Sequence, residues 1–123
     1  MTEQTFEEKL NQFLAIVKQA GIKTYRNRMA CCRTCASVEV PGYETSQPII
    51  WTFGGQGMAV SVKGNEVKYR AGGAPAAELY FNHVNLREED KYEIINAIRR
   101  AGLDSEWAGQ DELTITIKTG AGL

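Results

Sequence analysis

Apolar residues near the N-terminus recur with the period of a helix. They are spaced three or four residues apart and form one stripe on a helical surface: Phe6, Leu10, Phe13, Leu14 and Val17. Thr5 and Glu8 have the spacing of a capping box, which closes the first turn. Gly21 can take the left-handed conformation that ends a helix. The pattern therefore predicts a helix over about residues 5–20.

A second helical pattern predicts a helix over about residues 86–101. Asn85 is the expected N-cap, with Glu88 three residues later. Acidic residues follow at the start and arginines come at the end, so both ends complement the helix dipole. Gly102 is expected to close this helix in the same way as Gly21 closes the first. The predicted buried face consists of Tyr92, Ile94, Ile95 and Ile98.

Between the helices, about residues 37–84, short runs of β-favouring residues are separated by glycine-rich turns. The clearest runs are residues 49–53, 58–63, 66–70 and 78–84. Alternation of apolar and polar residues is typical of strands with one buried face. Gly64 and Asn65 mark a tight turn between two of them. Such an order predicts an antiparallel meander.

After the second helix, residues 103–118 predict a hairpin, in which Leu113, Ile115 and Ile117 alternate with threonines. Residues 119–123 are expected to fray. Strands and helices do not alternate, so a parallel nucleotide-binding sheet is not expected. The whole chain, residues 1–123, is predicted to be one α+β domain: an antiparallel β-sheet with two helices packed on one face.

Composition narrows the classes of partner. The chain has 14 basic and 15 acidic side chains and a net charge of -1, which gives no electrostatic reason to expect nucleic acid. No stretch approaches the roughly 18 apolar residues of a membrane span, so no membrane partner is expected. The polar N-terminus and the three clustered cysteines do not resemble a secreted disulfide scaffold. We therefore expect a cytoplasmic protein.

The residues with the most distinctive chemistry are Cys31, Cys32 and Cys35. Cys32 and Cys35 have the spacing of half a structural zinc site. A complete site would need Cys31 and His83, the only histidine, as the other two ligands. Adjacent residues of an extended chain point to opposite sides, so Cys31 and Cys32 share a metal only if the backbone turns sharply between them.

Three other interpretations of the cysteines remain open, one of which is a disulfide or sensor thiol without enzyme function. A C-x-x-C pair can carry redox chemistry when it opens a helix, but residues 36–40 here have a strand pattern. The simplest interpretation is packing, since free cysteine is among the most buried residue types. Under that interpretation the protein has no cofactor, whereas the first interpretation implies zinc.

Three segments carry a resemblance to a known family: residues 29–36 (MACCRTCA), 79–83 (LYFNH) and 101–117 (AGLDSEWAGQDELTITI). Over about residues 10–118 the chain resembles an uncharacterised domain-of-unknown-function family of bacteria, chiefly actinobacteria. The resemblance implies that the three cysteines and His83 belong together. Members often carry a polar pair such as Gln-Asp after this histidine, where the present chain has Val84 and Asn85. The family has no established activity to transfer.

The sequence contains no complete catalytic set, since no serine lies in a nucleophile-elbow pattern and no second histidine assists one. We therefore expect a small non-enzymatic accessory protein, encoded by a bacterium or a phage. It would act by binding an unidentified protein partner or by self-association, in a regulatory or host-interaction role. The alternative is a metal- or thiol-centred protein that uses the cysteines and His83. The aromatic residues considered as interface anchors are Trp51, Tyr80 and Trp107.

The packing interpretation of the cysteines predicts three free thiols per denatured chain and no bound metal. Protein purified without chelator should be tested by elemental analysis and by thiol titration in denaturant. About one zinc per chain would contradict packing and support the site formed by Cys31, Cys32, Cys35 and His83.

Overall fold

The computed structural model describes residues 4–25, 47–52, 60–69, 72–110 and 115–120. Its elements are α1 (Phe6–Gln19), β1 (Lys23–Tyr25), β2 (Ile49–Thr52), β3 (Val60–Lys63), β4 (Glu66–Tyr69), β5 (Glu78–Val84), α3 (Glu88–Arg100), β6 (Asp104–Ser105) and β7 (Ile115–Lys118). Neither described helix is long and apolar enough to cross a membrane.

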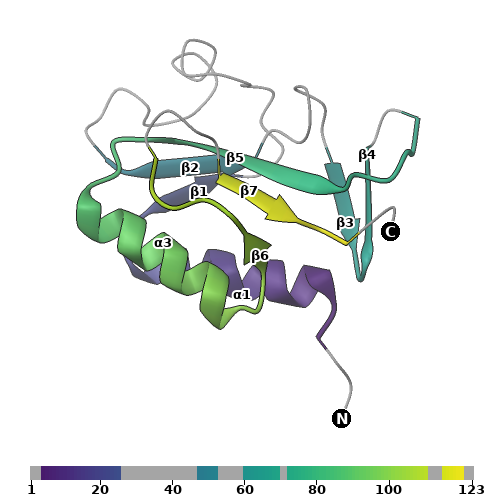
Figure 1. Ribbon diagram of the computed structural model, residues 1–123, viewed down its shortest axis with the longest axis horizontal. Coiled ribbons are helices and arrows are strands. Elements are labelled where there is room, and N and C mark those ends of the chain that lie inside the picture. Colours follow the sequence, from purple (N-terminus) through teal and green to yellow (C-terminus); the bar gives the residue numbers. More distant parts are fainter. Residues whose placement is uncertain (1–3, 26–46, 53–59, 70–71, 111–114, 121–123) are drawn as a thin grey trace.

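Within the described ranges, five strands form the main sheet in the order β1-β2-β5-β7-β6, and the two described helices lie on one side of it (Figure 1). The α+β class and the placement of the helices on one face are therefore confirmed. The sheet is mixed, because β1 pairs with β2 in parallel while the other neighbours are antiparallel. The sequence pattern did not reveal β1, because a strand of three residues is too short to show alternation.

The strands β3 and β4 form a separate two-stranded ladder that interrupts the predicted meander. The turn at Gly64 and Asn65 joins them as expected, with φ of +60° at Gly64. Val60 and Val67, one from each strand, are buried in the same core as α1. The hairpin therefore packs at one end of the helix layer instead of extending the main sheet (Figure 1).

The main core lies between the helices and the sheet. On β5 the residues alternate between buried and half-buried, as the sequence pattern predicted. Phe81 of β5 meets Phe13 of α1 edge to face, with ring centroids 5.6 Å apart and an interplanar angle of 71°. Both rings are fully buried. A smaller core on the opposite face of β2 contains Ile49 and Trp51, so β2 is buried on both of its faces.

Both described helices end at the predicted glycine, and each ending is a Schellman motif. The amide of Gly21 donates to the carbonyl of Lys18 (3.0 Å) and that of Ile22 donates to Val17 (3.3 Å), with φ of +88° at Gly21. After α3 the equivalent bonds run from Gly102 to Arg99 (3.1 Å) and from Leu103 to Ile98 (3.0 Å). The first exit leads into β1 and the second into β6, which are the two edge strands of the sheet.

The start of α1 is bound by the β3–β4 turn as well as by its own capping box. Asn65 Oδ1 accepts from the amide of Phe6 (2.8 Å), and the carbonyl of Gly64 accepts from the amide of Glu7 (2.9 Å). Thr5 Oγ1 accepts from the amide of Glu8 (3.2 Å), which confirms the predicted capping box. Three helix N–H groups that have no partner within the helix are thus satisfied, two of them by a turn distant in sequence.

Replacing Asn65 with alanine should lower the free energy of unfolding by about 1 kcal/mol, because the partly buried Phe6 amide loses its acceptor. Asn65→Asp keeps an acceptor oxygen and adds a favourable charge at the helix N-terminus, so it should retain most of the stability. Urea denaturation of the three proteins measures the difference. Equal destabilisation by alanine and aspartate would show that the acceptor oxygen does not matter.

Candidate functional site

The predicted cysteine and histidine site is only partly described by the structure. Cys31, Cys32 and Cys35 lie outside the described residues. His83 is 4% exposed on the helix-facing side of β5, and its ring centroid is 5.5 Å from that of Trp107. Within the described ranges, no group of three or more His, Cys, Asp or Glu side chains is arranged to hold a metal ion. The zinc site therefore remains a prediction from the sequence.

The three aromatic residues considered as interface anchors have different environments. Trp51 is fully buried and packs beside Ile49, because aromatic side chains on a strand covered on both faces join the core. Trp107 is 7% exposed and belongs to the main core. Tyr80 is half-buried on β5, where its hydroxyl donates to Glu78 Oε1 (3.0 Å). Burial, followed by this carboxylate, raises the pKa of Tyr80. An exposed anchor is thus not found at either tryptophan.

On α3 an aromatic residue that was predicted to be buried is exposed: Tyr92 is 69% exposed. Its buried residues are Asp90, Lys91, Ile94, Ala97 and Ile98. Tyr92 precedes Ile94 by two residues, which places the two side chains roughly 200° apart around a helix. Tyr92 is the one large hydrophobic side chain that is exposed in the described part of the chain. The spacing of two residues between Tyr92 and Ile94 was the signal in the sequence that could have shown that Tyr92 is exposed.

Tyr92 lies at one end of a groove between α3 and the segment that follows it. Two clefts, of about 360 and 150 Å³, adjoin each other and are both lined by Ile95 and Ala108. We call this surface the α3 groove and define it by Tyr92, Ile95, Arg99, Leu103, Trp107 and Ala108. Arg99 forms no ion pair with any described residue. The groove thus combines an exposed aromatic ring, apolar side chains and Arg99, which has no ion pair among the described residues although Asp104 lines the same cleft.

The wall opposite α3 is held by polar contacts. Trp107 Nε1 donates to the carbonyl of Gln110 (3.1 Å), and the Gln110 side chain accepts from the amide of Ala108 (2.9 Å). The stem of Lys91 lies beside Gly109, with Cδ 3.5 Å from where a Cβ would stand, and its amino group binds Glu88 (3.3 Å). These contacts preorganise the groove before any partner arrives.

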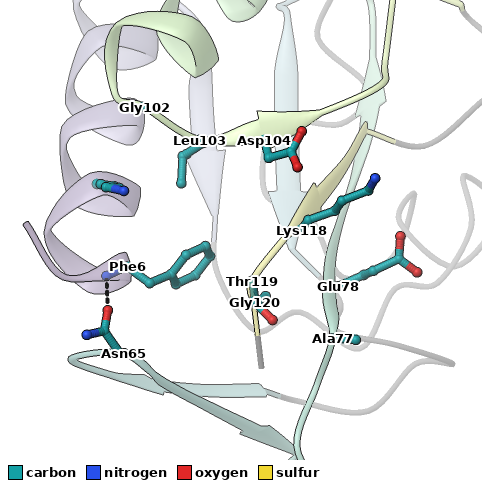
Figure 2. Close-up of a pocket in the computed structure, with 11 residues that line it drawn as sticks. Phe6, Asn65, Ala77, Glu78, Gly102, Leu103, Asp104, Lys118, Thr119 and Gly120 are labelled. Atoms are coloured by element: carbon teal, nitrogen blue, oxygen red, sulfur yellow. Dashed lines mark hydrogen bonds between the residues drawn. The ribbon is translucent and has the colours of Figure 1, made fainter. Parts of the chain in front are cut away.

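A larger cleft of about 510 Å³ opens at the other side of β6 (Figure 2). We call it the α1–β7 cleft, because it runs from the start of α1 to the end of β7. Phe6 and Leu103 provide apolar walls, and Figure 2 shows Asp104, Lys118 and Glu78 along the neighbouring strands. Glu78 and Asp104 both lie directly opposite Lys118 in the sheet register. Charged groups therefore border an apolar interior.

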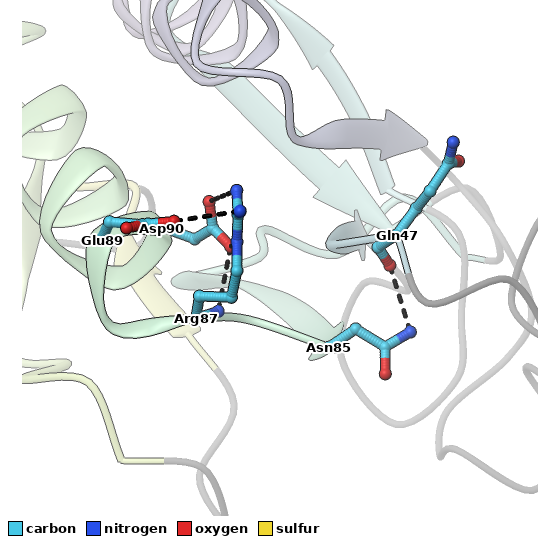
Figure 3. A network of polar contacts seen from close by, with 5 residues as sticks. All are labelled: Gln47, Asn85, Arg87, Glu89 and Asp90. Atoms are coloured by element: carbon cyan, nitrogen blue, oxygen red, sulfur yellow. Dashed lines mark hydrogen bonds and ion pairs between the residues drawn. The ribbon is translucent and has the colours of Figure 1, made fainter.

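The start of α3 departs from the predicted cap. Asn85 has φ of +59°, a left-handed conformation that asparagine tolerates, and its side-chain amide donates to the carbonyl of Gln47 (3.1 Å) (Figure 3). The helix begins three residues later, at Glu88. Arg87 is the N-cap, and its amide donates to Asp90 Oδ2 (2.9 Å). Asn85 thus serves the turn between sheet and helix, which is why it does not cap α3.

Arg87 and Asp90 form a bidentate ion pair (Figure 3). The guanidinium donates to the two carboxylate oxygens at 3.0 and 3.2 Å, while Asp90 is only 2% exposed. Burial alone would raise the pKa of Asp90, but the hydrogen bonds and the charge of Arg87 together lower it below its usual value. The carboxylate is therefore charged at neutral pH and stabilises the first turn of α3.

Comparison with known proteins gave no match to a family model, a curated protein or a solved structure.

Asp90→Asn should reduce the free energy of unfolding at pH 7 by roughly 1–2 kcal/mol, because it removes the charge from a buried carboxylate that is hydrogen-bonded to the largely exposed Arg87. The pKa of Asp90 is lowered in the folded protein, so the unfolded chain takes up the proton first as the pH falls. The stabilisation is therefore present above the ordinary carboxyl pKa of about 3.9 and is lost at lower pH.

Denaturant titrations of both proteins between pH 7 and about pH 2.5 test this linkage. Glu89→Gln is the control, because Glu89 also binds Arg87 (3.0 Å) but is largely exposed, and its loss should have little effect. A difference between wild type and Asp90→Asn that stays constant over the whole pH range would contradict the assignment.

Proposed function

We propose that the protein is a small non-enzymatic accessory protein that binds a protein partner through the α3 groove. The observation that carries this proposal is Tyr92, a large aromatic side chain that is 69% exposed at one end of the preformed α3 groove. Tyrosine is among the residues most enriched at interface hot spots, because it offers apolar area and a polar tip with few rotatable bonds.

The exposed side chain of Tyr92 contributes little to the stability of the fold. The buried residues of α3, which hold the helix on the core, lie on its other side: Asp90, Lys91, Ile94, Ala97 and Ile98. Exposed aromatic side chains beside apolar clefts are typical of surfaces that are covered by a partner. Binding would bury the ring together with Ile95 and Leu103, which are already partly buried against the core.

The charge at the groove indicates what the partner presents. Arg99 lines the larger of the two clefts and has no ion pair among the described residues. A partner segment with an apolar residue for the Tyr92 end and an acidic residue near Arg99 would complement the groove. Such a charge affects the rate and specificity of association more than the affinity.

Tyr92→Ala should weaken partner binding at least tenfold, since an interfacial tyrosine hot spot contributes more than about 1.4 kcal/mol. A photocrosslinking residue placed at position 92 should first identify the partner in cells of the source organism, with the same residue at exposed Lys68 as the control. Affinity is then measured with purified proteins by titration calorimetry.

Tyr92→Phe keeps the ring and should retain most of the affinity, while both variants should unfold at the wild-type midpoint because the side chain is exposed. Crosslinks that are equally strong from positions 92 and 68 would contradict the groove as the interface. The same holds if Tyr92→Ala binds the purified partner as tightly as wild type.

A further inference from the structure

We propose that the α1–β7 cleft is a second, separate binding site, and that its ligand is a short apolar peptide with free termini. This inference does not depend on the α3 groove: Leu103 and Asp104 line both surfaces, but Phe6 and Lys9 line only the α1–β7 cleft, and Tyr92 lines only the groove. It rests on the volume of the cleft, its apolar interior and two charged side chains, Lys9 and Asp104, that form no ion pair with any described residue.

The size and the walls suit a small apolar molecule. A volume of about 510 Å³ lies within the range of roughly 300–1,000 Å³ that is usual for small-ligand sites. Phe6, which is 7% exposed, and Leu103 both line it (Figure 2). The position of Phe6 is fixed, because its amide is bound to Asn65 and its ring belongs to the core. The apolar interior is therefore preformed.

Most of the charged groups around this cleft already have partners. Lys118 binds Glu106, with Nζ 3.4 Å from Oε1. Glu78 accepts the hydrogen bond from the hydroxyl of Tyr80. In contrast, neither Lys9 nor Asp104 forms an ion pair or a side-chain hydrogen bond with any described residue. One cation and one anion thus remain available to a ligand.

The two free charges come from different elements. Lys9 is on α1, and its stem lies over the end of α3, with Cε 3.8 Å from where a Cβ of Gly102 would stand. Asp104 is on β6, two residues beyond Gly102. A ligand with a carboxylate for Lys9, an ammonium group for Asp104 and apolar side chains for Phe6 and Leu103 would complement the cleft. A dipeptide of apolar residues has the two charged termini, one peptide group between them and two apolar side chains.

A simple apolar carboxylate such as a fatty acid fits less well. It would pair with Lys9 but would leave Asp104 without a partner, and Glu78 would add a second negative charge at the same cleft. Like charges that are not compensated oppose binding. The zwitterion is therefore the ligand that the charges favour.

The dipeptide leucyl-phenylalanine is the probe for the test, followed by NMR titration of the full chain. We expect saturable shifts at Gly102, Asp104 and Gly120, which line the cleft. Lys9→Gln and Asp104→Asn should each weaken binding about threefold, which is the size of one partly exposed ion pair. Lys18→Gln and Glu93→Gln, which change charges outside the cleft, should have no effect.

Blocked dipeptides identify which charge binds which terminus. The N-acetylated dipeptide has no ammonium group, so it should bind wild type more weakly than the free dipeptide, and Asp104→Asn should not weaken its binding further. The C-amidated dipeptide has no carboxylate, so it should also bind wild type more weakly, and Lys9→Gln should not weaken its binding further. Tyr92→Ala should bind the probe as well as wild type, which separates this site from the α3 groove. Absence of saturable shifts, equal binding of blocked and free dipeptides, or preferential binding of lauric acid would each overturn the proposal.

Discussion

The contact between Phe13 of α1 and Phe81 of β5, fully buried with the rings edge to face at 5.6 Å, joins the helix layer to the sheet. Around it α1 packs on α3, on β1 and on the β3–β4 hairpin. The apolar stripe of α1 therefore does more than cover the sheet. The stripe sets the distance between the layers. At the start of α1, backbone amides donate hydrogen bonds to the turn at Gly64 and Asn65. An isolated helix of this length would be marginal, so the packing and the caps depend on each other.

The two helix endings determine where the edge strands and the clefts beside them lie. Each Schellman motif turns the chain at a glycine and leads it into an edge strand, β1 after α1 and β6 after α3. β6 is only two residues long, yet Leu103 and Asp104 line clefts on both of its sides. The positive φ of Gly102, +75°, makes this sharp exit possible. Both candidate binding surfaces thus originate from the way in which α3 ends.

Within α3 the residues that stabilise the fold and those that remain available for binding lie on different faces. Asp90 is buried, bound to Arg87 and held charged, so it stabilises the helix start. Tyr92, two residues later, has no such role and remains in solvent. An exposed apolar side chain that does not contribute to the core is typical of a surface that binds a partner.

The sequence by itself determined the α+β class, the two helices with their glycine endings, the strand from Glu78 to Val84 and the turn at Gly64 and Asn65. These features depend on periodicity and on backbone conformations that few residues tolerate, which are local properties of the chain. Tertiary structure alone decided the parallel pairing of β1, the docking of the β3–β4 turn on α1, and the burial of Trp51 and Trp107. It also decided which charges near β6 find partners. Those outcomes depend on segments far apart in sequence, whose contacts no local pattern encodes.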